Sequence, residues 1–313
     1  MILNSLKLSV LDLVPVLQGV DAYTALQQAV RLAQAAERFG YSRYWTSEHH
    51  DMALLASATP EVLLAHIGAQ TKQIRIGSGG VLLPHYKPIK VAESFHLLAA
   101  LYPGRVDLGI GRAPGGSAEA VMALNDNFLE QNRKMPESLK ALSELLDHRF
   151  QMENKTVIAR PIPPVAPELW LLGTNRKSAS YAAELGAGYV FGQFMSDQDA
   201  LEVLSVYRDQ FQPSKLQQEP RTIVTIAVVC AETEEEARRL ARGGGLLFNP
   251  DGVKETETAS ASKRIVIGNP RQVQDQLLLM QERYKVDEFM IVTMTPEYDE
   301  RIRSYELIKI IGG

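Results

Sequence analysis

The stretch Lys7-Leu-Ser-Val-Leu-Asp-Leu-Val-Pro-Val16 decides between two α/β folds. The segment from Lys7 to Leu11 has the apolar character of a buried strand. An open, doubly wound sheet that binds a dinucleotide carries a Gly-x-Gly-x-x-Gly turn directly after its first strand. The turn here, Asp12 to Val16, contains no glycine. We therefore favour a closed (β/α)8 TIM barrel over the open sheet.

Further strand-like segments follow at regular intervals, and a helical segment lies between most of them. The strands are expected at 42–46, 74–77, 105–110, 168–172, 188–191, 222–230 and 288–293. Helix starts are marked by Asp21, by the hydroxyl of Thr59 before Pro60, and by Asn269 with Gln272 three residues later. Eight strand–helix units in 313 residues predict a single barrel domain over residues 1–313.

The stretch from Gly243 to Lys263 does not fit this alternation. It contains Gly243-Gly244-Gly245 and a polar run from Glu255 to Ser262. We interpret it as a mobile excursion before the last strand–helix units, either a lid over one end of the barrel or a loop without a role.

The composition is that of an ordinary soluble protein, with 45% hydrophobic and 22% charged residues and a formal net charge of −4. No dense Lys/Arg stripe supports a nucleic-acid partner. No apolar stretch is long enough to span a bilayer, and Lys7 and Asp12 interrupt the amino-terminal run, which argues against a signal peptide. The one cysteine, Cys230, suits a reducing compartment, so we predict a cytoplasmic location.

Polar residues follow several of the predicted strands. Because a parallel barrel gathers the carboxyl ends of its strands at one face, we expect the active site there. The residues expected at that face are Asp12, Glu48 to Asp51, Ser78 to Gly80, Arg112, Thr174, Asn175, Gln193 and Thr293.

The adjacent imidazoles of His49 and His50 allow three interpretations. Metal binding is weakly supported because neighbouring side chains point apart, and we predict no metal site. General acid–base work or hydrogen-bond donation is reasonable, since imidazole exchanges protons near neutral pH. A structural pair bonded to loop carbonyls is the third interpretation.

A flat, anionic ligand would suit the other strand ends. In Ser78-Gly79-Gly80 the glycines allow close backbone approach to a ligand, although a simple tight turn explains them equally well. The guanidinium of Arg112 suits an anionic or carbonyl-rich group.

The start of the helix after the fifth strand is a candidate phosphate site. Thr174, Asn175 and Ser178 supply hydroxyl, amide and backbone N–H groups there, and Arg133 could reach the same anion. The alternative is a capped helix with solvated basic residues.

With these motifs assembled, the sequence resembles the bacterial luciferase-like flavin monooxygenases, in particular the single-chain, alkanal monooxygenase-like branch. The resemblance spans nearly the whole chain. The matching segments are Trp45 to His50, Ile76 to Pro84, Val91 to Glu93, Pro103 to Gly115, Leu172 to Asn175 and Ser304 to Leu307.

The resemblance implies a TIM barrel that binds FMN at the carboxyl ends of its strands. It implies an FMN-dependent oxidoreductase that takes reduced FMN from a separate reductase and reacts it with O₂. A flavin C4a-hydroperoxide then oxygenates a small organic substrate such as a long-chain aldehyde. On this chain His49 and His50 would be the catalytic residues beside the flavin. The candidate cofactor-binding residues are Asp12, Ser78, Gly79, Gly80, Arg112, Arg133, Thr174, Asn175 and Ser178, with a cis peptide bond implied at Gly79-Gly80.

Two departures from the family pattern bear on function. The light-emitting members carry a reactive cysteine immediately before the arginine, and Gly111 stands there in this chain, which argues against light emission. Thr174-Asn175 stands where relatives tend to have a serine pair, although an asparagine amide can still donate to phosphate.

Two alternatives keep the same fold. A deazaflavin-dependent oxidoreductase would transfer hydride without O₂, and Arg176-Lys177 could serve its longer anionic tail. A flavin-binding protein without turnover would not need Glu48-His49-His50. The family resemblance also implies a homodimer formed through helices that include 62–69 and 91–101.

Overall fold

A computed structural model describes residues 6–244 and 264–310 of the chain. The predicted eight-stranded barrel is confirmed. Its strands pair in parallel, each with the next, and the eighth pairs with the first to close the ring. In ring order they are β1 (Lys7–Asp12), β2 (Arg43–Thr46), β3 (Arg75–Ser78), β5 (Val106–Gly111), β8 (Glu168–Gly173), β9 (Gly188–Gly192), β10 (Thr222–Cys230) and β12 (Glu288–Val292).

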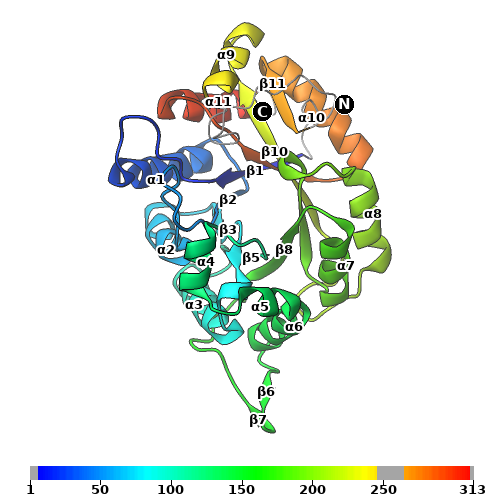
Figure 1. Cartoon of the computed structure of the whole chain (residues 1–313). Helices are drawn as coiled ribbons and strands as arrows, with labels where there is room; N and C mark the ends of the chain where they lie inside the picture. The colour runs from blue at the N-terminus through cyan, green and yellow to red at the C-terminus, as the bar shows by residue number, and fades with distance from the viewer. Residues whose placement is uncertain (1–5, 245–263, 311–313) are drawn as a thin grey trace.

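Helices surround the ring of strands on its outside (Figure 1). They are α1 (Ala22–Arg38), α2 (Pro60–Gln70), α3 (Pro88–Leu101), α6 (Met135–Leu146), α7 (Arg176–Leu185), α8 (Ala200–Gln210), α9 (Glu234–Gly244), α10 (Pro270–Tyr284) and α11 (Tyr298–Ile310). No helix in the described ranges is both long and apolar enough to cross a membrane.

The predicted helix caps hold at two of three places. Asp21 accepts from the backbone N–H of Thr24, and Asn269 forms a reciprocal capping box with Gln272. The expected hydroxyl cap at Thr59 is wrong, because its side chain makes no capping hydrogen bond. Its carbonyl instead accepts from the N–H groups of residues 62 and 63.

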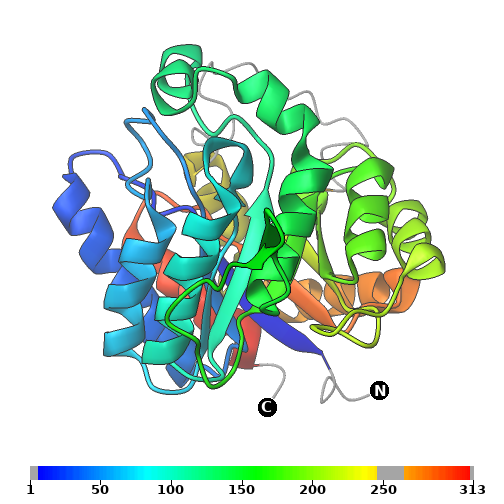
Figure 2. The same cartoon turned by 90° about the horizontal axis from the view of Figure 1, so that it is seen from below.

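Several short elements have too few residues to produce a readable periodicity in sequence. They are β4 (Val81–Leu82), the 3₁₀ turn η1 (Leu83–His85), α4 (Ala118–Leu124), α5 (Phe128–Arg133), β6 (Gln151–Met152), β7 (Lys155–Thr156), η2 (Gln193–Met195) and β11 (Ile265–Gly268). Helices α4 and α5 lie at the end of the barrel opposite the start of β1 (Figure 2). Of the predicted excursion, Gly243 and Gly244 end α9, and residues 245–263 lie outside the described residues.

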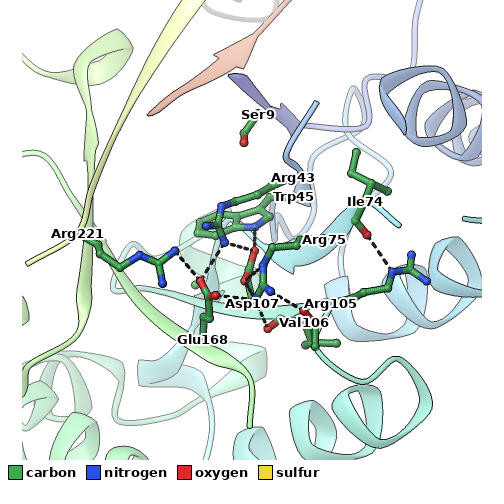
Figure 3. Close-up of polar contacts among 12 residues, drawn as sticks. Ser9, Arg43, Trp45, Ile74, Arg75, Arg105, Val106, Asp107, Glu168 and Arg221 are labelled. Carbon is green, nitrogen blue, oxygen red and sulfur yellow. Dashed lines mark hydrogen bonds and ion pairs between the residues drawn. The ribbon is translucent and has the colours of Figure 1, made fainter. Parts of the chain in front are cut away.

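A charged layer fills the amino-terminal end of the barrel (Figure 3). The guanidinium of Arg43 donates to Asp107 at 2.8 Å, to Glu168 at 3.1 Å and to Glu288 at 2.9 Å. Arg221 bonds Glu168 from the opposite side at 2.9 Å. Burying a charge is costly unless it is paired, and each charge here has partners of opposite sign. This layer closes the lower end of the barrel.

An apolar layer lies above the charged one and forms the floor of the upper end. It consists of Leu11, Trp45, Trp170, Val190, Ile223, Met290, Val292 and Met294. Two glycines make room for the indole of Trp45. A Cβ on Gly77 would lie 2.6 Å from its Nε1, and a Cβ on Gly109 would lie 3.1 Å from its Cζ3. Gly77 and Gly109 are therefore needed for the packing of Trp45 beneath the site.

Candidate functional site

The loop after β2 and the loop after β5 meet at the carboxyl end of the barrel. The backbone N–H of His50 donates to the carbonyl of Gly115 at 2.7 Å, and His50 forms a parallel bridge with Gly116. A Cβ on Gly116 would lie 2.2 Å from the His50 carbonyl, so the contact requires glycine. The two sequence blocks that carried the prediction are therefore neighbours.

Glu48 connects these loops to a third one. Its Oε1 lies 2.9 Å from Nε2 of His50 and accepts from the hydroxyl of Tyr86 at 2.8 Å. Its Oε2 accepts from the backbone N–H of Leu82 at 3.1 Å, and Leu82 pairs with Gly111 at the end of β5. Burial and the charge of Glu48 raise the pKa of the Tyr86 phenol.

His49 lies beside this cluster in a half-buried position. Its Nδ1 is 3.0 Å from the hydroxyl of Ser47, and its backbone N–H donates to Ser57 at 2.8 Å. Burial, followed by the neighbouring His50, lowers the pKa of His49 from 6.5. The His49 imidazole is therefore held toward its neutral form, which can accept a proton.

His85 and Tyr86 belong to the site although the sequence interpretation missed them. Nε2 of His85 lies 2.9 Å from the carbonyl of Pro114, and its ring stacks on Phe128 at 4.9 Å between centroids. The edge-to-face contact of His85 with His50 has a centroid distance of 6.1 Å. Their position in the sequence, shortly after the Ser78-Gly79-Gly80 turn that ends the third strand, could have identified them.

Arg112 lies where β5 ends, on the same rim as the two histidines. Its guanidinium has no hydrogen-bond or ion-pair partner among residues 6–244 and 264–310. It lies close enough to Tyr189 to oppose the rise that burial produces in the pKa of that phenol. The Tyr189 hydroxyl is 3.0 Å from that of Ser178 in the first turn of α7. Arg112 therefore faces the start of α7.

The start of α7 carries a capping box rather than a set of free side chains. Oδ1 of Asn175 accepts from the N–H of Ser178 at 3.1 Å, and the Ser178 hydroxyl donates to the Asn175 carbonyl at 2.7 Å. The Ser178 side chain is buried, and its hydroxyl already bonds within the protein. The Asn175 amide nitrogen and the first two N–H groups of the helix have no partner in the described part of the chain. These donors at the positive end of a helix favour an anion.

The other predicted phosphate ligands are less centrally placed. Arg133 is exposed on the last turn of α5, and no described contact joins it to Arg112 or Asn175. Its neighbour Asn132 donates to the Arg112 carbonyl at 3.3 Å. Thr174 is half-buried, and its carbonyl accepts from the hydroxyl of Ser196 at 2.8 Å.

The expectation that Asp12 faces the mouth is wrong. Its carboxylate is enclosed and accepts from Arg301 at 2.8 Å, from Tyr44 at 2.6 Å and from the N–H of Val14 at 2.7 Å. Side chains alternate along a strand, and Leu11 occupies the inward position, so Asp12 points outward to α11.

Other predicted mouth residues also have enclosed side chains. The Ser78 hydroxyl bonds the backbone of Gly109, donating at 2.8 Å and accepting at 3.1 Å. The Thr293 hydroxyl donates to a carbonyl of β10, and Gln193 is buried. The Gly79-Gly80 peptide bond is cis, as the resemblance implies. A Cβ on Gly79 would lie 2.4 Å from Leu11, so this turn is packed tightly on the floor.

A cavity of about 940 Å³ is lined by the segment that carries α4 and α5, all of its lining residues falling between 114 and 134. Its lining includes Pro114, Val121, Met122, Phe128 and Arg133. Asn125 donates to the Pro84 carbonyl at 2.7 Å, which holds this segment against η1. The lining is mostly apolar, and its charged residues have both signs: Asp126 and Glu130 as well as Arg133 and Lys134. Within the described ranges, no group of three or more His, Cys, Asp or Glu residues could hold a metal ion.

Comparison with known proteins identifies relatives over the full length of the chain. The family model described as luciferase-like monooxygenase matches residues 6–285. The uncharacterised protein YwcH of Bacillus subtilis is 42% identical, covering 97% of this chain and 98% of that protein. The N-acetyl-S-alkylcysteine monooxygenase of Bacillus subtilis is 36% identical, covering 97% of both.

Solved structures share the architecture. The crystal structure of apo-MsnO8 superposes with a TM-score of 0.90 at 35% identity, covering 99% of this chain and 98% of that one. Two more distant structures show the fold alone. The FMN complex of the oxygenating constituent of 3,6-diketocamphane monooxygenase from Pseudomonas putida has a TM-score of 0.78 at 20% identity, with 97% and 96% coverage. An F420-dependent secondary alcohol dehydrogenase has a TM-score of 0.73 at 17% identity, with 99% coverage of both chains.

Proposed function

This chain belongs to the luciferase-like monooxygenase family, and from that premise we propose that it is a flavin-dependent monooxygenase. It uses reduced FMN and O₂ to oxygenate a small organic substrate. The observation that carries the proposal is the shared rim: His50, next to His49, is bonded through Gly115 and Gly116 to the loop that begins with Arg112.

The donors around Arg112 fit the phosphate of FMN. A guanidinium without a protein partner, the Asn175 amide and the start of α7 converge there from β5 and α7. Charge-assisted hydrogen bonds to phosphate are stronger than neutral ones. Arg112 and Asn175 bind the phosphate in this proposal, and Ser178 acts by holding the helix start in shape.

The floor and the histidines fit the ring end of the same cofactor. Leu11 and the Gly79-Gly80 turn pack over the buried Trp45 and give this end of the barrel an apolar floor. Reduced FMN supplies the electrons that activate O₂ when bound. His49, held toward the neutral form, accepts a proton or a hydrogen bond from the bound ligand, and His50 lies next to it.

The cavity lined by the segment that carries α4 and α5 suits the substrate. Its side chains of Val121, Met122 and Phe128 favour an apolar molecule, such as the chain of an aldehyde. A separate reductase supplies the reduced flavin. This step is supported by the name of the diketocamphane relative, which is an oxygenating constituent.

The contacts of two basic residues, Arg176 and Lys177, favour FMN over a deazaflavin. Arg176 forms an ion pair with Glu202, and the ammonium of Lys177 lies over the ring of Tyr181 at 5.7 Å. Neither is free to bind a longer anionic tail without giving up these contacts. Titrating the protein with both cofactors separates the two readings, and tighter deazaflavin binding contradicts the FMN proposal.

Turnover distinguishes the monooxygenase from a protein that only binds flavin. With an added reductase, NADH, FMN and candidate aldehydes, we expect O₂ uptake coupled to product formation. The His49→Ala and His50→Ala variants should bind FMN and lose this coupling. Binding without any substrate-dependent O₂ uptake, across aldehydes and thioethers, would contradict the proposal.

We also propose a homodimer formed through α2 and α3. Val62, Leu97 and Leu101 are exposed on these helices, at 66%, 51% and 56%, whereas most of their other apolar residues pack inward. Sedimentation should give twice the chain mass of 34.7 kDa. A Leu97→Glu variant should shift the protein to monomer, and a monomeric wild type would remove this part of the proposal.

A further inference from the structure

Glu48 is enclosed at the mouth, with 3% of its surface exposed. Three groups surround its carboxylate. They are the backbone N–H of Leu82, the hydroxyl of Tyr86 and Nε2 of His50. Its role goes beyond joining loops, because the chemistry of these partners determines where the proton of the His50 ring must sit.

An ionised carboxylate only accepts hydrogen bonds, whereas a neutral imidazole carries its single proton on one of two nitrogens. Leu82 and Tyr86 donate to Glu48, so the remaining contact is satisfied when Nε2 of His50 donates as well. We propose that Glu48 is a positioning residue that holds His50 as the Nε2–H tautomer and leaves the lone pair of Nδ1 for the ligand.

The surroundings of His50 keep its ring in place for this role. Nδ1 of His50 has no hydrogen-bond partner among the described residues. It is also not among their polar atoms that are both buried and unpaired, so it is open at the mouth. The backbone of His50 is fixed to Gly115, and His85 packs edge-on against its ring. The inference rests on the proposed function, in which His50 faces the bound flavin and substrate.

The Glu48→Gln substitution should reverse the tautomer. The Leu82 N–H cannot turn, so it selects the amide oxygen of the new side chain as its acceptor. The amide NH₂ then faces Tyr86 and His50. The hydroxyl of Tyr86 can accept as well as donate, whereas Nε2 of His50 can accept only if the proton moves to Nδ1. The lone pair at the mouth is then lost.

Nitrogen NMR of histidine-labelled protein measures this directly, without cofactor or substrate. His50 is assigned by the loss of its signals in His50→Gln. We expect the wild type to show a protonated Nε2 and an unprotonated Nδ1, and Glu48→Gln to show the reverse. A wild-type spectrum with the proton on Nδ1 overturns the inference by itself, as does an unchanged tautomer in a folded Glu48→Gln.

Two control variants separate this role from a general disturbance. Glu61→Gln removes a nearby carboxylate that has no hydrogen bond to His50 and should leave the tautomer unchanged. Tyr86→Phe removes one donor but keeps the charge of Glu48, and should also preserve Nε2–H. A tautomer change in either control contradicts the assignment to Glu48.

Activity provides the second readout. A well-placed general base contributes roughly 10²- to 10⁴-fold, so we expect kcat of Glu48→Gln to fall by at least about tenfold, with KM and FMN affinity changed much less. An unchanged kcat in a variant with the reversed tautomer overturns the catalytic use of Nδ1. A wild type that binds no flavin overturns the proposed function, and the spectra still decide the tautomer.

Discussion

The guanidinium of Arg301 in the last helix donates to the carboxylate of Asp12 at the end of the first strand, over a distance of 2.8 Å. The two side chains are 3% and 0% exposed. The same guanidinium donates to the Thr293 carbonyl at 2.8 Å. The pair therefore fastens α11 to the place where the barrel closes, between β12 and β1.

Replacing Arg301 tests this fastening. In Arg301→Met the Asp12 carboxylate stays buried without its cationic partner, and breaking a buried pair in this way costs about 3–5 kcal/mol. We expect a loss of that size in the free energy of unfolding measured with urea. Arg303→Met on the same helix breaks exposed pairs with Glu232 and Glu306 and should cost no more than about 1 kcal/mol. Equal losses would contradict the special role of Arg301.

Flavin affinity should depend on Arg112 and not on Arg176. A hydrogen bond to a charged group contributes about 1.5–3 kcal/mol, so Arg112→Ala should raise the Kd for FMN by roughly 10- to 100-fold. Arg176→Ala, which breaks only a surface ion pair with Glu202, should leave the Kd nearly unchanged. Fluorescence quenching on titration measures both. An Arg112→Ala variant that binds like the wild type would place the phosphate elsewhere.

The ionisation of His49 should make the fold less stable in acid. Its pKa is lowered from 6.5 in the folded protein, chiefly by burial, so the unfolded chain takes up a proton first as the pH falls. Stability from this group is present above pH 6.5 and is lost below it. A His49→Gln variant should show a smaller loss of unfolding free energy between neutral pH and pH 5. Titration of His49 above 6.5 in an NMR experiment would refute the assignment.

Removal of His50 should raise the pKa of His49 only in part. The neighbouring imidazole is the second cause of the shift, and burial, the first, remains in His50→Gln. The same NMR titration should therefore give a His49 pKa between that of the wild type and 6.5.

Glu61 should oppose stability at neutral pH. Burial, together with the charge of Glu48, raises the pKa of this carboxyl in the folded state. A raised pKa means that stability is full below the unfolded value and is lost as the pH rises through the folded one. Glu61→Gln should raise the free energy of unfolding at pH 7, by less than about 1 kcal/mol because the group is partly solvated. The gain should vanish at pH 4, and a gain that persists there would exclude an ionic origin.

The single thiol should resist modification. Burial raises the pKa of Cys230 to about 12, and 1% of its surface is exposed. Thiolates are the reactive form, so an aromatic disulfide reagent at pH 8 should react only as fast as the protein opens. Adding denaturant should release one equivalent at once. Fast labelling of the native protein would show that this part of β10 opens readily.

The ring of strands could be predicted from sequence because each strand is a compact apolar run between helical patterns. The short elements could not, since β4 and β11 have no period of their own and form by pairing with β5 and β10. The parallel barrel alone placed the loops after β2 and β5 at the same end, whereas their direct contact is seen only in the structure.

The roles of single residues were harder to predict because they depend on which way a side chain points. Asp12 ends a strand, yet the inward place next to it belongs to Leu11, so the carboxylate faces outward. The environment of Glu48 comes from Leu82 and Tyr86, which are more than thirty residues away in sequence. Such contacts appear only when the chain is folded.

The two glycines beside Trp45 separate the packing of the strands from the lining of the cavity. The Trp45 indole fits where it does because neither Gly77 nor Gly109 carries a β-carbon. The position of this ring is thus set by the strands themselves, whereas the cavity is lined by the segment that carries α4 and α5. Substitutions in that segment should therefore reshape the cavity without disturbing the packing around Trp45.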